Sequence, residues 1–252
     1  MTASVIIVCH LTCTGDGVRA TICLGGSILV PEQPDVDTVR TAASVLRDLR
    51  KKGYELLVVA GGGKVARVYI DTARKFKATD VDCDTLGIDV TRLNARLLIL
   101  ALGDIAEQNP ATTFEAAVRV MLRGKIPVMG GTVPGHTTDA VAAGLADASR
   151  SDLLVFFTNV DGVYTADPKL DPRAKKIETM TSRQLLELVA SVEMKPGITT
   201  IVDPISAKII DRSRIKTLVL GKHEIPRLQK ILEGAEHSGT TVVPREKLGR
   251  GS

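Results

Sequence analysis

The chain of 252 residues contains no tryptophan, and aromatic residues make up only 3% of it. A hydrophobic core must therefore be built mainly from valine, leucine, isoleucine and alanine, as is typical of buried parallel sheets. No stretch approaches the roughly 18 apolar residues of a membrane-spanning helix. The short apolar run at residues 5–8 follows no Lys or Arg, so it does not match a secretion signal. We therefore expect a cytoplasmic protein with no membrane partner.

Charge and cysteine content exclude two further classes of protein. The net charge is +4, with both signs interspersed along the chain, and no basic stripe with interleaved aromatic residues suggests a nucleic-acid partner. No C-x-x-C pair is present, so we expect no zinc site. Free thiols in a reducing compartment are the expected state of the four cysteines, Cys9, Cys13, Cys23 and Cys83.

Several catalytic motifs are also missing. Gly63-Lys64 is followed by Val65 rather than Ser or Thr, and no glycine stands five residues before Gly63, which excludes a P-loop. No G-x-G-x-x-G sequence follows a strand, so dinucleotide binding is not expected. A nucleophile elbow, an H-E-x-x-H motif and a Ser/His/Asp set are likewise not found.

What the chain does contain is an alternation of apolar strands and amphipathic helices, which predicts an α/β fold with a mainly parallel sheet covered on both faces. Gly53 is expected to end the first long helix, and Asp203-Pro204 to begin a later one. The helix predicted at residues 64–77 carries Val65, Val68, Tyr69, Ala73 and Phe76 on one face. Strands are predicted at residues 18–24, 55–60, 126–129, 153–157, 215–220 and 240–243, and helices at 36–52, 64–77, 86–107, 114–123, 139–150, 182–189, 205–212 and 224–232.

Three of the predicted strands end in glycine pairs or triplets. These are Gly25-Gly26-Ser27, residues 61–63 before Lys64, and Gly130-Gly131-Thr132. A single turn of this kind usually only accommodates positive φ, but glycine also lets backbone N–H groups approach an anion closely. Helices that start just after such turns add their N-terminal partial charge. Three glycine turns at one edge of a sheet therefore favour a polyphosphate site.

Polar residues accompany these turns. Thr137 and Thr138 precede a predicted helix and are candidates to hold a phosphate, whereas Asp139 is expected to cap that helix. His136 is a lone histidine on a loop. It either contacts the substrate or faces solvent, and we expect no role for it as a base. Candidate cations for phosphate neutralisation are Lys64, Arg67, Arg92 and Lys208.

A further polar segment, residues 158–168, follows the apolar strand at residues 153–157. It offers the Thr158 hydroxyl, the Asn159 amide, the Tyr164 phenol, and the carboxylates of Asp161 and Asp167. Ligands of open α/β sheets bind outside the carboxyl ends of the strands. This segment is therefore predicted to hold the base and ribose of a nucleotide.

Together these motifs closely resemble the archaeal-type uridylate (UMP) kinases of the amino-acid kinase superfamily. The motifs are the three glycine turns, the helix segment at residues 86–95 (LGIDVTRLNA), the loop at residues 130–139 and the segment at residues 158–168. The resemblance covers about residues 18–244. It implies a three-layer α/β/α sandwich with about eight strands, and phosphoryl transfer from MgATP to UMP in pyrimidine nucleotide biosynthesis. It also implies a hexamer built as a trimer of dimers.

The resemblance further implies two lobes and a set of site residues. Residues 18–150 would bind UMP and residues 151–244 ATP, with residues 1–17 an extension and residues 245–252 a flexible tail. Mg²⁺ would be held mainly by nucleotide and water, with no protein metal ligands. UMP would meet Gly61, Arg67, Asp84, Thr132, Val133, Pro134, Gly135, His136, Thr137 and Thr138. ATP would meet Cys23, Leu24, Gly25, Gly26, Ser27, Gly62, Arg67, Thr158, Asn159, Tyr164 and Asp167, and the catalytic cations would be Lys208 and Arg67.

The chain also departs from the family pattern. Cys23 stands where many members carry a first-strand lysine, so Lys208 is expected to supply the missing charge. A small Gly-Ser loop of the family is replaced by residues 197–200, where Ile198 is more apolar. Two alternatives stay open: another small-molecule kinase of the superfamily, and a non-catalytic nucleotide- or anion-binding protein on this fold.

Overall fold

The computed structural model describes residues 17–166, 171–193 and 202–245. Within these residues the main sheet has seven strands in the order β3-β2-β1-β4-β8-β9-β7. The first five are mutually parallel, β9 runs antiparallel to β8, and β7 runs parallel to β9. Their bounds are β1 Arg19–Leu24, β2 Glu55–Ala60, β3 Val128–Met129, β4 Leu153–Thr158, β7 Thr179–Thr181, β8 Lys216–Gly221 and β9 Thr240–Val243.

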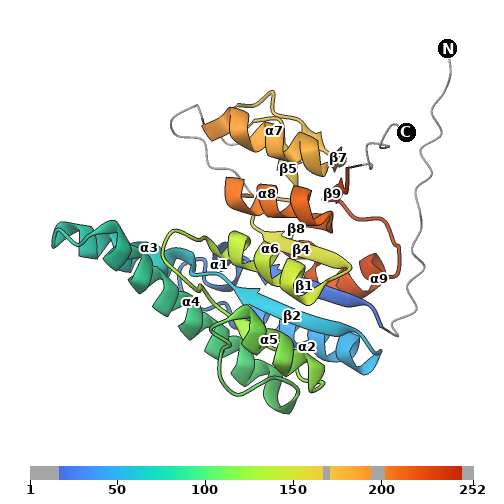
Figure 1. Ribbon diagram of the computed structural model, residues 1–252, viewed down its shortest axis with the longest axis horizontal. Coiled ribbons are helices and arrows are strands. Elements are labelled where there is room, and N and C mark those ends of the chain that lie inside the picture. Colours follow the sequence, from blue (N-terminus) through green and yellow to red (C-terminus); the bar gives the residue numbers. More distant parts are fainter. Residues whose placement is uncertain (1–16, 167–170, 194–201, 246–252) are drawn as a thin grey trace, which may run out of the picture.

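Helices cover both faces of this sheet (Figure 1). Alternate residues of each central strand point to opposite sides, as the two-residue period of a strand requires. One core packs Ile22, Val58 and Phe157 against α2 and α4, and the other packs Val59 and Phe156 against α5, α6, α7 and α8. The helices are α1 Gly26–Leu29, α2 Val36–Lys51, α3 Gly63–Lys75, α4 Asp80–Leu102, α5 Phe114–Leu122, α6 Thr138–Ser149, α7 Ser182–Glu193, α8 Pro204–Ser213 and α9 Leu228–Leu232, with 3₁₀ turns η1 Gly103–Ile105 and η2 Lys222–Arg227.

The predicted three-layer fold is therefore confirmed, although the main sheet has seven strands in the described ranges rather than eight. The sequence analysis missed α1, β7 and the small hairpin of β5 (Val163–Tyr164) with β6 (Lys176–Ile177). Each of these elements has only two to four residues, too few for a hydrophobic period to show. No helix in the described ranges combines the length and apolar character needed to cross a membrane.

Helix ends follow local side-chain chemistry. Gly53 lies just beyond α2 with φ +88°, and Asp203 caps α8 ahead of Pro204, both as predicted. The long helix α4 starts six residues earlier than predicted, because Thr79 and Asp82 form a capping box there. The prediction that Asp139 caps α6 is wrong: Thr137 does so, its hydroxyl accepting from the Ala140 amide at 3.1 Å.

One predicted core face points outward instead. On α3 and just after it, Val68, Tyr69 and Phe76 are 54%, 55% and 80% exposed, whereas Ala66 and Ala73 are buried. The neighbouring helix α4 exposes Val81, Leu93 and Leu100 as well. In Figure 1 these two helices extend together at one end of the molecule. The amphipathic pattern of α3 thus belongs to a surface rather than to the core of this chain.

Candidate active site

The order of the parallel strands brings the three glycine turns together. Strands β3, β2, β1 and β4 are consecutive neighbours, so their carboxyl ends lie side by side at one edge of the sheet. Gly25 follows β1, Gly61 follows β2, Gly130 follows β3, and Thr158 ends β4. This arrangement fulfils the expectation that ligand-binding groups gather outside the strand ends.

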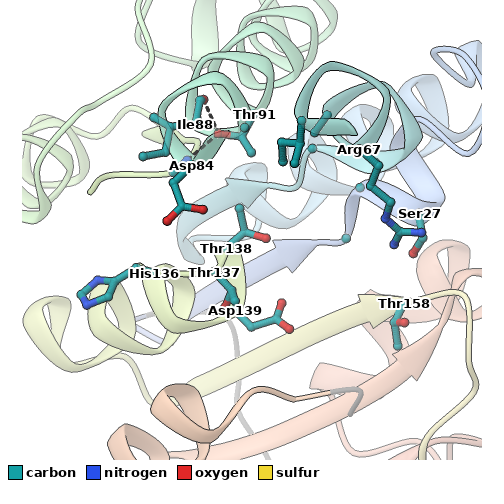
Figure 2. A pocket seen from close by; sticks show the side chains of 18 of the residues that line it. Ser27, Arg67, Asp84, Ile88, Thr91, His136, Thr137, Thr138, Asp139 and Thr158 are labelled. Atoms are coloured by element: carbon teal, nitrogen blue, oxygen red, sulfur yellow. Dashed lines mark hydrogen bonds between the residues drawn. The ribbon is translucent and has the colours of Figure 1, made fainter. Parts of the chain in front are cut away.

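A cavity of about 510 Å³ opens at this edge, within the usual size of a small-ligand site. Asp84 from α4 and Thr138 from α6 approach it from opposite sides (Figure 2). Of the predicted site residues, those that line the cavity are Gly25, Gly26, Ser27, Gly62, Arg67, Asp84, Gly135, His136, Thr137, Thr138 and Thr158.

The first two glycine turns pack backbone against backbone. A Cβ placed on Gly26 would lie 1.9 Å from the amide nitrogen of Gly63, and one on Gly61 would lie 2.2 Å from that of Gly26. Any side chain at either position would force the turns apart. The glycines therefore let the backbones of the two turns pack in contact beneath the cavity. Backbone amides close together in this way can bind several phosphate groups in a row.

The third turn continues into a loop whose later part is held by two carboxylates. The Gly135 amide donates to the Asp84 carboxylate at 2.7 Å, and the Thr137 hydroxyl donates to Asp203 Oδ2 at 2.6 Å. The α6 amides behind Thr137 begin a twelve-residue helix whose N-terminal partial charge favours an anion. The loop and the start of α6 therefore form one wall of the cavity, where the partial charge of the helix end favours an anion.

Asp139 has the most perturbed carboxyl group in the cavity. Burial, and then the charge of Asp203, raise the pKa of Asp139 to about 7. The Cys23 thiol lies 3.6 Å from Asp139 Oδ1, and burial together with Asp139 raises the pKa of Cys23 well above its ordinary value. Cys23 is thus a neutral group at neutral pH, in agreement with the expectation that it supplies no positive charge.

The four candidate cations have different surroundings. Arg67 lines the cavity from the first turns of α3, and Figure 2 shows its guanidinium reaching toward Ser27. Lys64 pairs instead with Glu32. Arg92 donates from Nε to the Gly131 carbonyl at 3.2 Å and from Nη2 to the Thr132 carbonyl at 3.3 Å. Lys208 is exposed on α8 and does not line the cavity.

On the β4 side, the structure brings only part of the predicted base and ribose site into the cavity. Thr158 lines it, and its hydroxyl donates to Asn159 Oδ1 at 3.3 Å. The Tyr164 phenol donates to Asp161 at 2.6 Å, and Lys176 also pairs with Asp161. These bonds tie the β5–β6 hairpin to the residues after β4. Asp167 and residues 197–200 lie outside the described residues.

The other predicted site residues that the structure describes do not line the cavity, namely Cys23, Leu24, Gly61, Thr132, Val133, Pro134, Asn159, Tyr164 and Lys208. Cys23 and Leu24 are buried within β1, and Gly61 turns its carbonyl toward α4. Lining residues that sequence reasoning gave no site role include Ala66, Ile70, Gly87, Ile88, Thr91, Asp139, Phe156 and Phe157. Three of these residues lie in the motif at residues 86–95. The family resemblance of that motif was the one signal in the sequence that pointed to them.

The fold and the cavity are those of the amino acid kinase family. The model of this family matches residues 20–221, and the chain belongs to it. It is 47% identical over 227 residues to a uridylate kinase of Pyrococcus abyssi, covering 90% of this chain and all of that protein. It is 44% identical over 227 residues to a uridylate kinase of Halobacterium salinarum, covering 90% of this chain and 94% of that protein.

Solved structures agree with these relationships. The crystal structure of uridylate kinase from Archaeoglobus fulgidus superposes with a TM-score of 0.79 at 38% identity, covering 90% of this chain and all of that one. A UMP kinase from Bacillus anthracis superposes with a TM-score of 0.75, covering 90% of this chain and 96% of that one. The identity to the second is 22%, so it supports the fold alone.

Proposed function

We propose that this protein is a UMP kinase, which transfers the γ-phosphoryl group of ATP to UMP and releases ADP and UDP. The single observation that carries the proposal is the shared cavity, lined by glycine turns from β1 and β2 and by the loop after β3. The extent of identity to uridylate kinases, over nearly their whole length, supports UMP as the acceptor.

Phosphoryl transfer requires alignment and charge neutralisation more than covalent help from the protein. We assign the ATP phosphates to Gly25, Gly26, Ser27 and Gly62, and the UMP phosphate to Gly61, Arg67 and the loop at residues 132–138. The two sites then meet where the first two glycine turns touch. Lys208 is assigned to the transferring phosphoryl group, which requires its side chain to turn from solvent toward Asp203 and the cavity.

The donor set beside the cavity fits Mg²⁺. This ion keeps several waters and binds through substrate phosphates plus one or two carboxylates. Asp139 and Asp203 supply such a pair; burial and then the charge of Asp203 raise the pKa of Asp139, and a bound cation would relieve the repulsion between the two carboxylates. When bound, the ion would neutralise charge on the phosphate oxygens.

The assembly is part of the same proposal. We propose that the chain associates with copies of itself through the exposed apolar residues of α3 and α4, among them Tyr69, Phe76 and Leu100. Several large apolar side chains exposed on two neighbouring helices are a feature of interaction sites. In a hexamer formed as a trimer of dimers, we place this surface at the contact between the two protomers of each dimer. The two nucleotide-binding lobes, residues 18–150 and 151–244, would lie within each protomer.

The experiment that tests the function measures ADP release from MgATP with UMP, CMP, dUMP, AMP and isopentenyl phosphate offered separately. Turnover with UMP in clear preference to the others is the expected result. Turnover with a different acceptor would keep the kinase activity but reject UMP as the substrate. A folded protein that binds ATP and turns over none of the acceptors would instead be a nucleotide-binding protein on this fold.

A further inference from the structure

The middle of α4 lies between the second and third glycine turns and is bonded to both. Three side chains make these bonds: Thr91, Arg92 and Asn94, here called the α4 anchors. Thr91 and Asn94 are buried, with 6% and 7% of their surface exposed. None of the three is among the residues assigned above to UMP or ATP, and only Thr91 lines the cavity.

Asn94 holds the second turn. Its side-chain amide donates to the Gly61 carbonyl at 2.8 Å and to the Gly62 carbonyl at 3.1 Å. Both hydrogens of the amide are thus engaged by consecutive carbonyl groups. Because the described residues contain no cis peptide bond, each carbonyl points opposite to the N–H of the next residue. Asn94 therefore directs the amides of Gly62 and Gly63 away from itself, and both glycines line the cavity.

Thr91 and Arg92 hold the third turn, Thr91 through the Gly131 amide and Arg92 through two carbonyls. The Thr91 hydroxyl donates to the Ile88 carbonyl and accepts from the Gly131 amide, both at 2.6 Å. Arg92 bonds the carbonyls of Gly131 and Thr132, which fixes the amides that follow them. A Cβ on Gly130 would stand 2.6 Å from Thr91 Oγ1, so the turn packs directly on α4.

We propose that the α4 anchors are positioning residues: they fix the backbone of the second and third glycine turns, and so the amides that face the cavity, before the nucleotide phosphates bind. Amides fixed in this way need no reorganisation when charge arrives, which is the condition for effective electrostatic stabilisation. This inference rests on the proposed function for the identity of the acceptor. It assigns Arg92 to the backbone of the loop rather than to the phosphate itself.

The bonding pattern predicts how kinetic effects divide between the substrates. Of the two glycine turns, the polar groups of Thr91 and Arg92 bond only the third in the described residues, so losing these bonds should raise the KM for UMP and leave the KM for ATP unchanged. Asn94 touches Gly61 and Gly62, which are assigned to different nucleotides, so its loss should raise both KM values. Removing one partner of a buried hydrogen bond leaves the other unsatisfied, and we expect KM changes of about tenfold.

The test compares Thr91→Val, which keeps the shape and removes the hydroxyl, with Thr91→Ser, which restores it. Arg92→Ala and Asn94→Ala complete the set, and Arg96→Gln is the matched control, since Arg96 is exposed one turn further on and, within the described residues, bonds Asn109 rather than a glycine turn. Steady-state kinetics with UMP and ATP varied in turn, UMP calorimetry and thermal melting are measured on each protein. The expected result is a raised UMP KM in Thr91→Val at unchanged ATP KM, with recovery in Thr91→Ser.

Two results would overturn the proposal. If Arg92→Ala weakens UMP binding while Thr91→Val has no effect, Arg92 contacts the phosphate by its charge and the loop needs no support. If melting temperature and both KM values change together in every variant of Thr91, these side chains serve only folding. Failure of the proposed function is separate, because it appears as absent UMP turnover in the unmodified protein, and UMP calorimetry then still compares the variants.

Discussion

Asp139 is the residue whose protonation depends most on the fold around it. Its carboxyl group packs against Cys23 of β1 and is close to Asp203 at the start of α8, and no cation is bonded to it in the described residues. The pKa of its carboxyl group is about 7 in the folded chain and about 4 in the unfolded chain, so the folded chain keeps this proton to a higher pH. Between about pH 4 and pH 7 the folded state therefore holds more protons, and stability falls as pH rises.

We expect Asp139→Asn to remove this dependence. The variant should gain stability relative to the unmodified protein as pH increases from about 5 to about 8, because the unmodified carboxylate becomes charged while buried. Urea unfolding at several pH values, without nucleotide or divalent cation, measures the difference. Asp104→Asn, an exposed position in η1, is the control. A stability difference between Asp139→Asn and the unmodified protein that stays constant with pH would contradict the assignment.

At the scale of the element, α2 shows how a single cap fixes where a helix begins. Asp35 accepts from the Thr38 amide at 2.9 Å and pairs with Lys222 across the chain. The bond from Lys222, followed by those from Thr38, lowers the pKa of Asp35 to about 2. The cap thus connects α2, which covers one face of the sheet, to the turn η2 after β8.

Replacing Asp35 by alanine should cost about 1 kcal/mol of stability near neutral pH, the typical loss for an N-cap. A lowered carboxyl pKa stabilises the fold above the unfolded value of about 4, and the contribution disappears as pH falls toward 2. The deficit of Asp35→Ala should therefore shrink in acid, which urea midpoints at pH 7 and pH 3 will show. Asp37→Ala, at an exposed position two residues on, should change stability by less than half as much at pH 7.

At the scale of the whole molecule, the exposed apolar side chains of α3 and α4 lie at one end of the fold, beside the cavity. Arg67 and Asp84, which line the cavity, come from these same two helices. Association through this face would therefore stabilise the elements that carry the acceptor side of the site.

Phe76→Glu should weaken self-association, because a charge at an 80% exposed aromatic position would be buried without a partner in the assembled state. We expect the variant to elute as a smaller species, with its mass measured by light scattering at several concentrations. Val36→Glu, on the exposed side of α2, is the matched control and should leave the mass unchanged. An unmodified protein that is a monomer at all concentrations would refute the assembly proposal.

The sequence by itself determined the layer order and most of the elements. Apolar runs such as β2 and β9 were predicted to the residue, because a buried strand ends where polar and glycine residues begin. The three glycine turns were recognised for the same reason, and local caps such as Asp203-Pro204 can be predicted from two residues. These features depend on neighbours in the chain, so the chain alone specifies them.

Only the tertiary structure decided which side chains face the cavity and which bond the backbone segments that line it. Arg92 has the charge of a phosphate ligand, yet it bonds two carbonyls some 40 residues further along the chain, a contact that no local pattern encodes. The outward turn of Phe76 is equally non-local, since the same amphipathic period suits a core or an interface. The raised pKa of Asp139 arises first from its burial and then from the charge of Asp203, and Asp203 comes beside it only when α8 packs on α6. Burial and proximity between distant segments set these properties, and both exist only in the folded chain.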